Sequence, residues 1–149
     1  MNGQNDPSID QTLVAAIVDD HRGREGPLLP VLHALQDEFG WIDEPTIRSI
    51  AAALNLSRAE VYGVASFYHD FRLTPATRPV LKLCRAEACQ ARGSESLASW
   101  LESQAEGRAL IETVYCLGLC SVGPNAMING VPHARLDKLS LSRLLEAMA

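Results

Sequence analysis

Two short stretches, C-R-A-E-A-C at residues 84–89 and C-L-G-L-C at residues 116–120, hold every cysteine of this chain. Four residues separate the cysteines of the first stretch and three separate those of the second. The 26 residues between the stretches are enough for a helix and a strand. All the thiols therefore lie in one half of the chain, in an arrangement that can converge on one centre. The four residues are Cys84, Cys89, Cys116 and Cys120.

A short apolar strand is predicted directly before each cysteine pair. Residues 80–83 lead into Cys84 and residues 110–115 lead into Cys116, with a helix predicted between them at 94–106. A strand–helix–strand crossover usually joins parallel strands, and ligand sites lie at the C-terminal ends of such strands. Both cysteine pairs are therefore expected at the same edge of one sheet.

The rest of this half completes a small sheet. Asn129-Gly130 separates the apolar segments 126–128 and 131–134, and this dipeptide is typical of a type I′ hairpin turn. Leucines and a methionine at helical spacing in residues 141–148 predict a last short helix. Strand, helix, strand, hairpin and helix together make a small α/β module.

The first half of the chain has the pattern of several helices. Segments of helical spacing begin after recognisable start signals. These signals are a capping box at Ser8 and Gln11, Pro27 at a first helical position, Asp43 as a cap, and a second capping box at Ser57 and Glu60. Pro75 and Pro79 then mark residues 72–79 as a linker. We expect a helical bundle at residues 1–74 and an α/β domain at residues 75–149.

The composition is that of a globular protein, with 47% hydrophobic and 21% charged residues. The net charge of −5 argues against nucleic acid as a partner, because phosphate binding needs a basic face. We see no secretory signal, and the early apolar run at 13–18 is far shorter than the about 20 residues needed to cross a bilayer. We expect a cytoplasmic protein without membrane insertion. Paired cysteines there bind metal or act in redox chemistry more often than they form structural disulfides.

Thiolates are soft ligands that favour zinc, Cu(I) or iron–sulfur centres. Zinc knuckles usually have two residues between cysteines, so the wider gaps here favour a [2Fe-2S] cluster, in which each iron takes two thiolates. The plant-type ferredoxin spacing does not match, and neither pair has the C-x-x-C spacing of thiol-redox enzymes. Rieske ligation would need histidines near the pairs, and His21, His33, His69 and His133 lie elsewhere. A structural zinc module and a dithiol oxidoreductase remain the alternatives.

Such a cluster carries net negative charge that grows on reduction, so it needs backbone N–H donors and nearby cations. Gly93, Gly118 and Gly123 would let the backbone approach it closely, although ordinary turns would explain them equally well. Arg85 and Arg92 flank the first pair, and a solvated surface position is the simpler interpretation for both.

Half of the eight aromatic residues fall within residues 62–71. Aromatic side chains anchor interfaces, and they also fill cores and domain junctions. We favour packing in the core or at a junction for Tyr62, Phe67, Tyr68 and Phe71.

The cysteine motifs C-x4-C and C-L-G-x-C, together with residues 28–42 and 61–71, resemble the thioredoxin-like [2Fe-2S] ferredoxin family. This family includes the 24-kilodalton subunit of respiratory complex I and related subunits of NAD-linked hydrogenases and formate dehydrogenases. The resemblance implies a thioredoxin-like α/β domain after a helical bundle, and one [2Fe-2S] cluster. It also implies a ligand set in which Cys84 and Cys89 bind one iron and Cys116 and Cys120 bind the other.

Within the family, the stretches F-Y-H-D-F-R, C-R-A-E-A-C-Q and Y-C-L-G-L-C-S-V-G-P most resemble the gamma subunit of soluble, NAD-dependent, molybdenum-containing formate dehydrogenase. This resemblance implies an electron-transfer subunit of an oxidoreductase, with no catalytic residue and no substrate chemistry of its own. The implied partners are an FMN- and iron–sulfur-bearing NAD-binding subunit and a molybdenum-containing catalytic subunit. The alternative is the equivalent subunit of NADH-quinone oxidoreductase or of an NAD-linked hydrogenase.

Overall fold

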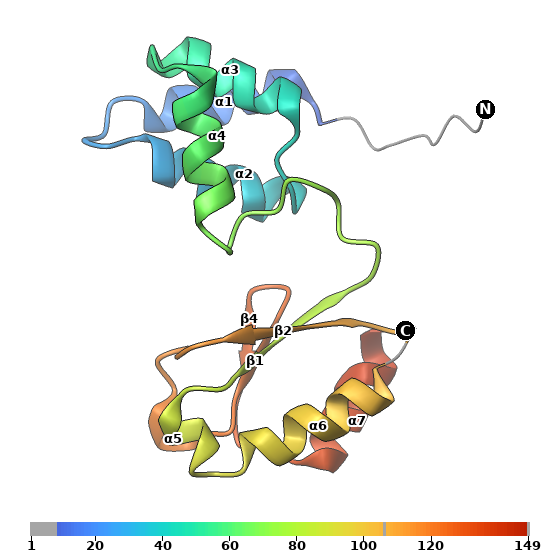
Figure 1. The fold of residues 1–149 in the computed structure, drawn as a ribbon. Helices are drawn as coiled ribbons and strands as arrows, with labels where there is room; N and C mark the ends of the chain where they lie inside the picture. The colour runs from blue at the N-terminus through green and yellow to red at the C-terminus, as the bar shows by residue number, and fades with distance from the viewer. Residues whose placement is uncertain (1–8, 106, 149) are drawn as a thin grey trace, which may run out of the picture. The chain divides into compact units, whose positions relative to one another are not determined.

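The computed structural model describes residues 9–105 and 107–148, and it divides the chain into two compact units. The first unit is Met1–Ala76 and the second is Thr77–Ala149. Helices make up the regular structure described in the first unit, whereas the second combines helices with a sheet (Figure 1). Among the described residues, no helix has both the length and the apolar character needed to cross a membrane.

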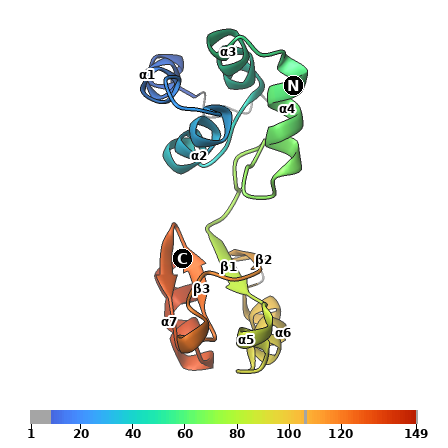
Figure 2. The same ribbon diagram turned by 90° about the vertical axis from the view of Figure 1, so that its left-hand side faces the viewer.

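The first unit is a bundle of short helices whose ends are defined by local hydrogen bonds (Figure 2). Asp43 caps its helix through the N–H of Thr46, and Ser57 forms the predicted reciprocal capping box with Glu60. The first helix begins differently from the prediction. Ser8 lies outside the described residues, and Asp10 is the N-cap. The helices are α1 (Gln11–His21), α2 (Leu28–Phe39), α3 (Glu44–Leu54) and α4 (Arg58–Phe67).

The core of this unit is apolar and lies between the helices. Helix α2 begins one residue later than predicted, with Pro27 as its N-cap, and ends at Gly40 in the left-handed region. Each fully buried Leu or Ile contributes about 1.5–3 kcal/mol by leaving water, so this core holds the four helices together. Its largest fully buried side chains are Leu32, Leu35, Ile42, Ile47 and Ile50.

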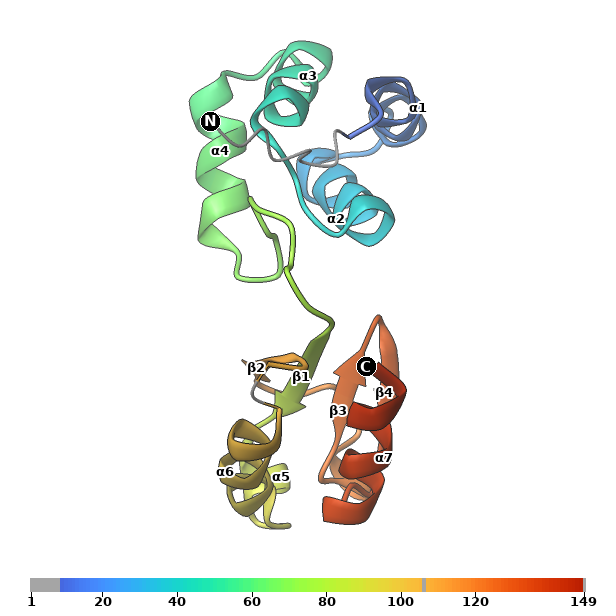
Figure 3. The same ribbon diagram turned by 90° about the vertical axis from the view of Figure 1, so that its right-hand side faces the viewer.

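The second unit is built on a four-stranded mixed sheet in the order β2-β1-β3-β4, so that β1 lies between β2 and β3 (Figure 3). Strands β1 and β2 are parallel, and β3 is antiparallel to both β1 and β4. Asn129 and Gly130 both have positive φ, which confirms the predicted type I′ hairpin turn. The strands are β1 (Val80–Cys84), β2 (Leu110–Val114), β3 (Ala126–Ile128) and β4 (Val131–His133).

Helices α6 (Ser94–Gln104) and α7 (Lys138–Met148) pack on this sheet and lie near each other (Figure 1). Leu81 and Leu83 of β1 are buried together with leucines of both helices. Two short elements were not predicted from the sequence, namely α5 (Glu87–Gln90) and the 3-10 turn η1 (Cys120–Val122). Both are too short to show a hydrophobic period, and each contains one of the cysteines.

Candidate metal centre

The two parallel strands end side by side and lead into the two cysteine pairs. Cys84 is the last residue of β1 and is in register with Val114, the last residue of β2. The N–H of Arg85 donates to the carbonyl of Val114 at 2.9 Å, so the two chain exits stay together. Cys116 follows two residues after Val114. The predicted parallel pairing is confirmed, and it places both pairs at one edge of the sheet.

The two pairs differ in exposure. Cys84 and Cys89 are each 1% exposed, whereas Cys116 and Cys120 are exposed. Helix α5 turns the chain back after β1 and carries Cys89 into the interior. The outer pair lies in the loop after β2, where the two sulfur atoms of Cys116 and Cys120 are 3.6 Å apart.

The loop of the outer pair has an unusual backbone. Cys116 has a φ of 75°, in the left-handed region that residues with a Cβ rarely adopt. The N–H of Gly118, itself at φ 77°, points back to the Cys116 sulfur at 3.4 Å. Such conformations persist where the surroundings over-determine them, and they cluster at functional sites.

Backbone dipoles favour the charged form of the inner thiol Cys84. Burial raises the pKa of this thiol, but N–H groups of Ala86, Cys116 and Leu117 oppose it, and the pKa falls below its ordinary value. Two of these donors belong to the loop of the outer pair. The outer loop therefore stabilises negative charge on a sulfur of the inner pair, as an anionic metal–thiolate centre requires.

The remaining shifts show that the thiols share one electrostatic environment. Burial, followed by the hydrogen bond and charge of Cys84, raises the pKa of Cys89. The hydrogen bond and charge of Cys116, with a smaller contribution from Cys84, raise the pKa of Cys120. A metal centre would remove this repulsion by replacing the protons.

Of the three glycines considered in the sequence, Gly123 has the closest contact with a thiol. A Cβ at this position would lie 3.1 Å from the Cys89 sulfur and 3.4 Å from Cδ of Arg92. Gly118 provides the N–H described above, whereas a Cβ on Gly93 would meet only the hydroxyl of Ser96 at 3.7 Å. Gly123 thus lets the backbone approach the Cys89 thiol, whereas glycine at position 118 allows the positive φ of the loop, and both features suit a metal–sulfur cluster.

The two flanking arginines have different surroundings. Arg85 is held by Glu95, with its Nε 2.9 Å from the carboxylate and a second nitrogen on the other oxygen. The Glu95 carboxylate thereby compensates the charge of Arg85 at the protein surface, the position predicted for this arginine from the sequence. The aliphatic part of Arg92 lies against Gly123.

Asn125 is a residue of this site that sequence reasoning missed. It is 1% exposed, and its carbonyl accepts the N–H of Cys84 at 2.9 Å. Its own N–H donates to the thiol of Cys89 and counteracts the rise in the pKa of that thiol. In the sequence, Asn125 is marked only by its position just before β3, and this position does not identify it as a residue of the site.

The candidate ligands are the two thiol pairs, and two of the four histidines have other contacts. Within residues 9–105 and 107–148, no three His, Cys, Asp or Glu side chains gather closely enough to hold one metal ion. His33 instead packs edge-on against Phe71, and His21 contacts the carbonyl of Ile17. Two separate thiol pairs are the arrangement that suits a centre with two irons.

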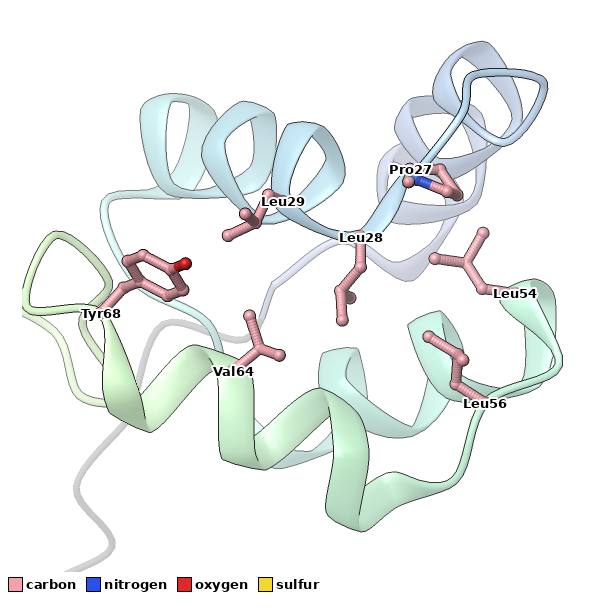
Figure 4. A pocket seen from close by; sticks show the side chains of 8 residues that line it. Pro27, Leu28, Leu29, Leu54, Leu56, Val64 and Tyr68 are labelled. Carbon is pink, nitrogen blue, oxygen red and sulfur yellow. The ribbon is translucent and has the colours of Figure 1, made fainter.

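The first unit contains an apolar pocket of about 400 Å³ (Figure 4). Leu28 and Val64 point toward each other across it, and Tyr68 lies at one end. Its lining is apolar apart from the phenol of Tyr68. For the aromatic segment, packing in the core is wrong for three of its four rings, and packing at a junction stays a prediction. Tyr62, Phe67 and Tyr68 are 43%, 72% and 42% exposed, and only Phe71 is buried.

Comparison with known proteins agrees with this geometry. The model of the thioredoxin-like [2Fe-2S] ferredoxin family matches residues 14–149. The chain is 32% identical over 133 residues to a subunit of the NADH-quinone oxidoreductase of Rhizobium meliloti (strain 1021), covering 83% of this chain and 79% of that protein. It is 31% identical over 127 residues to a subunit of the NADH-quinone oxidoreductase of Escherichia coli (strain K12), covering 79% and 76% respectively.

Solved structures show the same relationship. A crystal structure of NAD+-reducing [NiFe]-hydrogenase in the H2-reduced state matches 78% of this chain with a TM-score of 0.67 and 28% identity. In the air-oxidized state the match covers 81% with a TM-score of 0.68. This chain spans only 22% of the hydrogenase chain in both cases. The chain therefore belongs to the thioredoxin-like [2Fe-2S] ferredoxin family, whose cofactor is a [2Fe-2S] cluster.

Proposed function

We propose that this chain is an electron-transfer subunit that holds one [2Fe-2S] cluster. The ligands are Cys84 and Cys89 on one iron and Cys116 and Cys120 on the other. The observation that carries the proposal is the meeting of a buried and an exposed thiol pair at the ends of two parallel strands. When bound, such a cluster takes up and releases one electron at a time.

The chain's own residues have three tasks in this function. The inner pair fixes the cluster to the interior, and the N–H groups around Cys84 stabilise the negative charge on its thiolate. The outer pair lies at the surface, where a partner's redox group can approach. Tyr115, 73% exposed just before this pair, is part of the same surface.

We further propose that the partner is an FMN-bearing, NAD-binding subunit of an oxidoreductase complex. The similar proteins support this, because they belong to a quinone-reducing NADH enzyme and to an NAD+-reducing hydrogenase. These two kinds of complex have better support than formate dehydrogenase. The formate dehydrogenase with its molybdenum subunit stays a second candidate, favoured by the sequence stretches at residues 67–72, 84–90 and 115–124.

Metal analysis tests the first proposal. We expect anaerobically purified protein to be brown, with about two iron and two acid-labile sulfide per chain. An electron paramagnetic resonance signal should appear only after reduction. Zinc without sulfide would instead establish a structural zinc module, and thiol exchange without metal would establish a dithiol oxidoreductase.

Affinity purification of the native protein under mild conditions tests the partner. We expect a flavin-containing, NAD-binding subunit to co-purify from a whole-cell extract that includes the membranes. A nickel–iron subunit, a molybdenum subunit or a membrane-bound assembly in the same complex would then identify the hydrogenase, the formate dehydrogenase or the quinone-reducing enzyme. Recovery without any flavoprotein would overturn the partner proposal and leave the cluster proposal standing.

A further inference from the structure

Asn125 contacts three separate parts of the thiol site. Its carbonyl oxygen accepts from the N–H of Cys84, and its N–H donates to the thiol of Cys89. Its side-chain nitrogen Nδ2 donates to the carbonyl of Leu119 at 3.1 Å. Since Leu119 directly precedes Cys120, this bond joins the loop of the outer pair to the backbone that holds the inner pair.

The side-chain bond is the contact of Asn125 that depends on residue identity. Any residue at position 125 offers a backbone carbonyl for the inner pair, and any residue except proline also offers the N–H. Only a side-chain donor of suitable length reaches Leu119, and the asparagine amide provides one. The spacing between the inner and outer pairs is therefore set in part by one side chain.

The oxygen of the same side-chain amide destabilises the folded protein. Its oxygen Oδ1 is buried without a hydrogen-bond partner among the described residues. A buried polar atom left unpaired destabilises the folded state. Asn125 thus contributes an uncompensated acceptor to the interior while its donor holds the cysteine loop, which points to a role in the site rather than in stability.

We propose that Asn125 is a positioning residue that holds the two cysteine pairs at the separation required by the cluster. It acts through Leu119 and does not touch the cluster itself. This inference rests on the proposed ligation of one cluster by all four thiols. Loss of the Nδ2 donor would free the Cys116–Cys120 loop while the bonds to Cys84 and Cys89 remain.

Two substitutions separate the donor from the shape of the side chain. Asn125→Leu keeps the approximate size and branching of the side chain and loses the donor, and Asn125→Ala removes the side chain beyond Cβ, including the donor and the unpaired acceptor. Ser94→Ala is the matched control, since the Ser94 hydroxyl is also fully buried in the same unit and has no hydrogen-bond partner in the described part of the chain. All three would be compared with wild-type protein as full-length chains.

The measurement is the rate at which visible absorption disappears in excess iron chelator. We expect cluster loss to be at least about tenfold faster in both Asn125 variants, as for other residues that orient metal ligands, and unchanged in Ser94→Ala. The resonance line shape of the reduced cluster should also change only in the Asn125 variants. Thermal unfolding of the apo proteins, read in parallel, separates positioning from stability.

Each outcome has a distinct meaning. Wild-type protein without iron and sulfide would overturn the proposed function itself. A second outcome would overturn only the role of Asn125. In it, the wild-type protein holds a stable cluster, and Asn125→Ala loses its own cluster at the same rate and shows the same resonance line shape. If the variants do not fold, hydrogen exchange of the Asn125 side-chain amide in wild-type apo protein decides, since fast exchange means that the bond to Leu119 is absent.

Discussion

Cys84 and Cys89 lie inside the second unit, each 1% exposed, whereas Cys116 and Cys120 lie at its surface. The inner pair is supported by backbone N–H groups from three segments of the chain. The outer pair is held by a strained loop and by its own sulfur–sulfur contact of 3.6 Å. The two irons of the proposed cluster would therefore have unequal surroundings, one enclosed by protein and one open to a partner.

The strongest test of this comparison is to replace each cysteine singly by serine. All four variants should lose cluster, and we expect Cys84→Ser and Cys89→Ser to retain none, because a serine ligand must be ionised and a buried alkoxide has no water to stabilise it. Cys116→Ser and Cys120→Ser should hold a weak cluster with altered absorption. Iron content and visible spectra measure this. Unchanged colour in any variant would show that the ligand set is wrong.

The second test adds a methyl group next to the inner cysteine pair and leaves the outer pair unchanged. Gly123→Ala places a Cβ 3.1 Å from the Cys89 sulfur, and the crowding should cost the folded apo protein about 1–3 kcal/mol and weaken cluster retention. The measurements are the free energy of unfolding in urea and the rate of cluster loss to chelator.

Gly118→Ala is the matched variant for the outer pair. Nothing lies within 4 Å of its Cβ, so the expected effect is only the backbone strain at φ 77°, about 1 kcal/mol. If Gly123→Ala has no greater effect on the cluster than Gly118→Ala, close packing at the inner pair is not a determinant of the site.

Local signals in the sequence were sufficient for much of the fold. The capping box of Ser57 and Glu60 and the turn at Asn129-Gly130 are interactions between near neighbours, so the residue types alone predict them. The parallel pairing of β1 and β2 followed from the crossover between them. Because each cysteine pair directly follows one of these strands, the pairing also predicts that both pairs meet at one edge of the sheet.

The inequality of the two pairs was not predictable in this way. Both motifs have similar spacing, and the burial of Cys89 depends on α5, a helix of four residues without a hydrophobic period. Asn125 contacts segments that are distant in sequence, and no motif includes it. Contacts of this kind arise from the tertiary structure, and neither composition nor spacing contains them.

The third test uses chemical modification of the apo protein. The lowered pKa of Cys84 favours its reactive thiolate form. Because it is buried, we expect an alkylating reagent to modify Cys116 and Cys120 at least about tenfold sooner. Peptide mapping by mass spectrometry after short exposures measures the order. Equal rates would mean that the inner pair opens freely without the cluster, and that its enclosure depends on the metal.

The smallest expected effect concerns the surface charge beside the inner pair. Arg85, next to Cys84, lowers the pKa of Glu95 through their hydrogen-bonded ion pair. A carboxyl group with a lowered pKa in the folded state stabilises that state above its ordinary pKa, and this contribution is lost as the pH falls through the lowered value. Glu95→Gln should therefore reduce the stability of the apo protein slightly at pH 7 and have less effect at acidic pH.

Urea unfolding of wild-type and Glu95→Gln apo protein at pH 7 and at a pH well below the ordinary glutamate pKa of 4.5 measures this difference. Glu44→Gln is the control in the first unit, where Arg58 and Arg48 lower the pKa of Glu44 in the same way but far along the chain from any cysteine. Both variants should show the same pH dependence of unfolding, because both ion pairs are exposed and screened.

Only Glu95→Gln should also shift the reduction potential of the loaded protein upward, since the charge of Arg85 next to Cys84 is then uncompensated. An identical potential in both variants would show that the surface charge next to the inner pair does not reach the cluster.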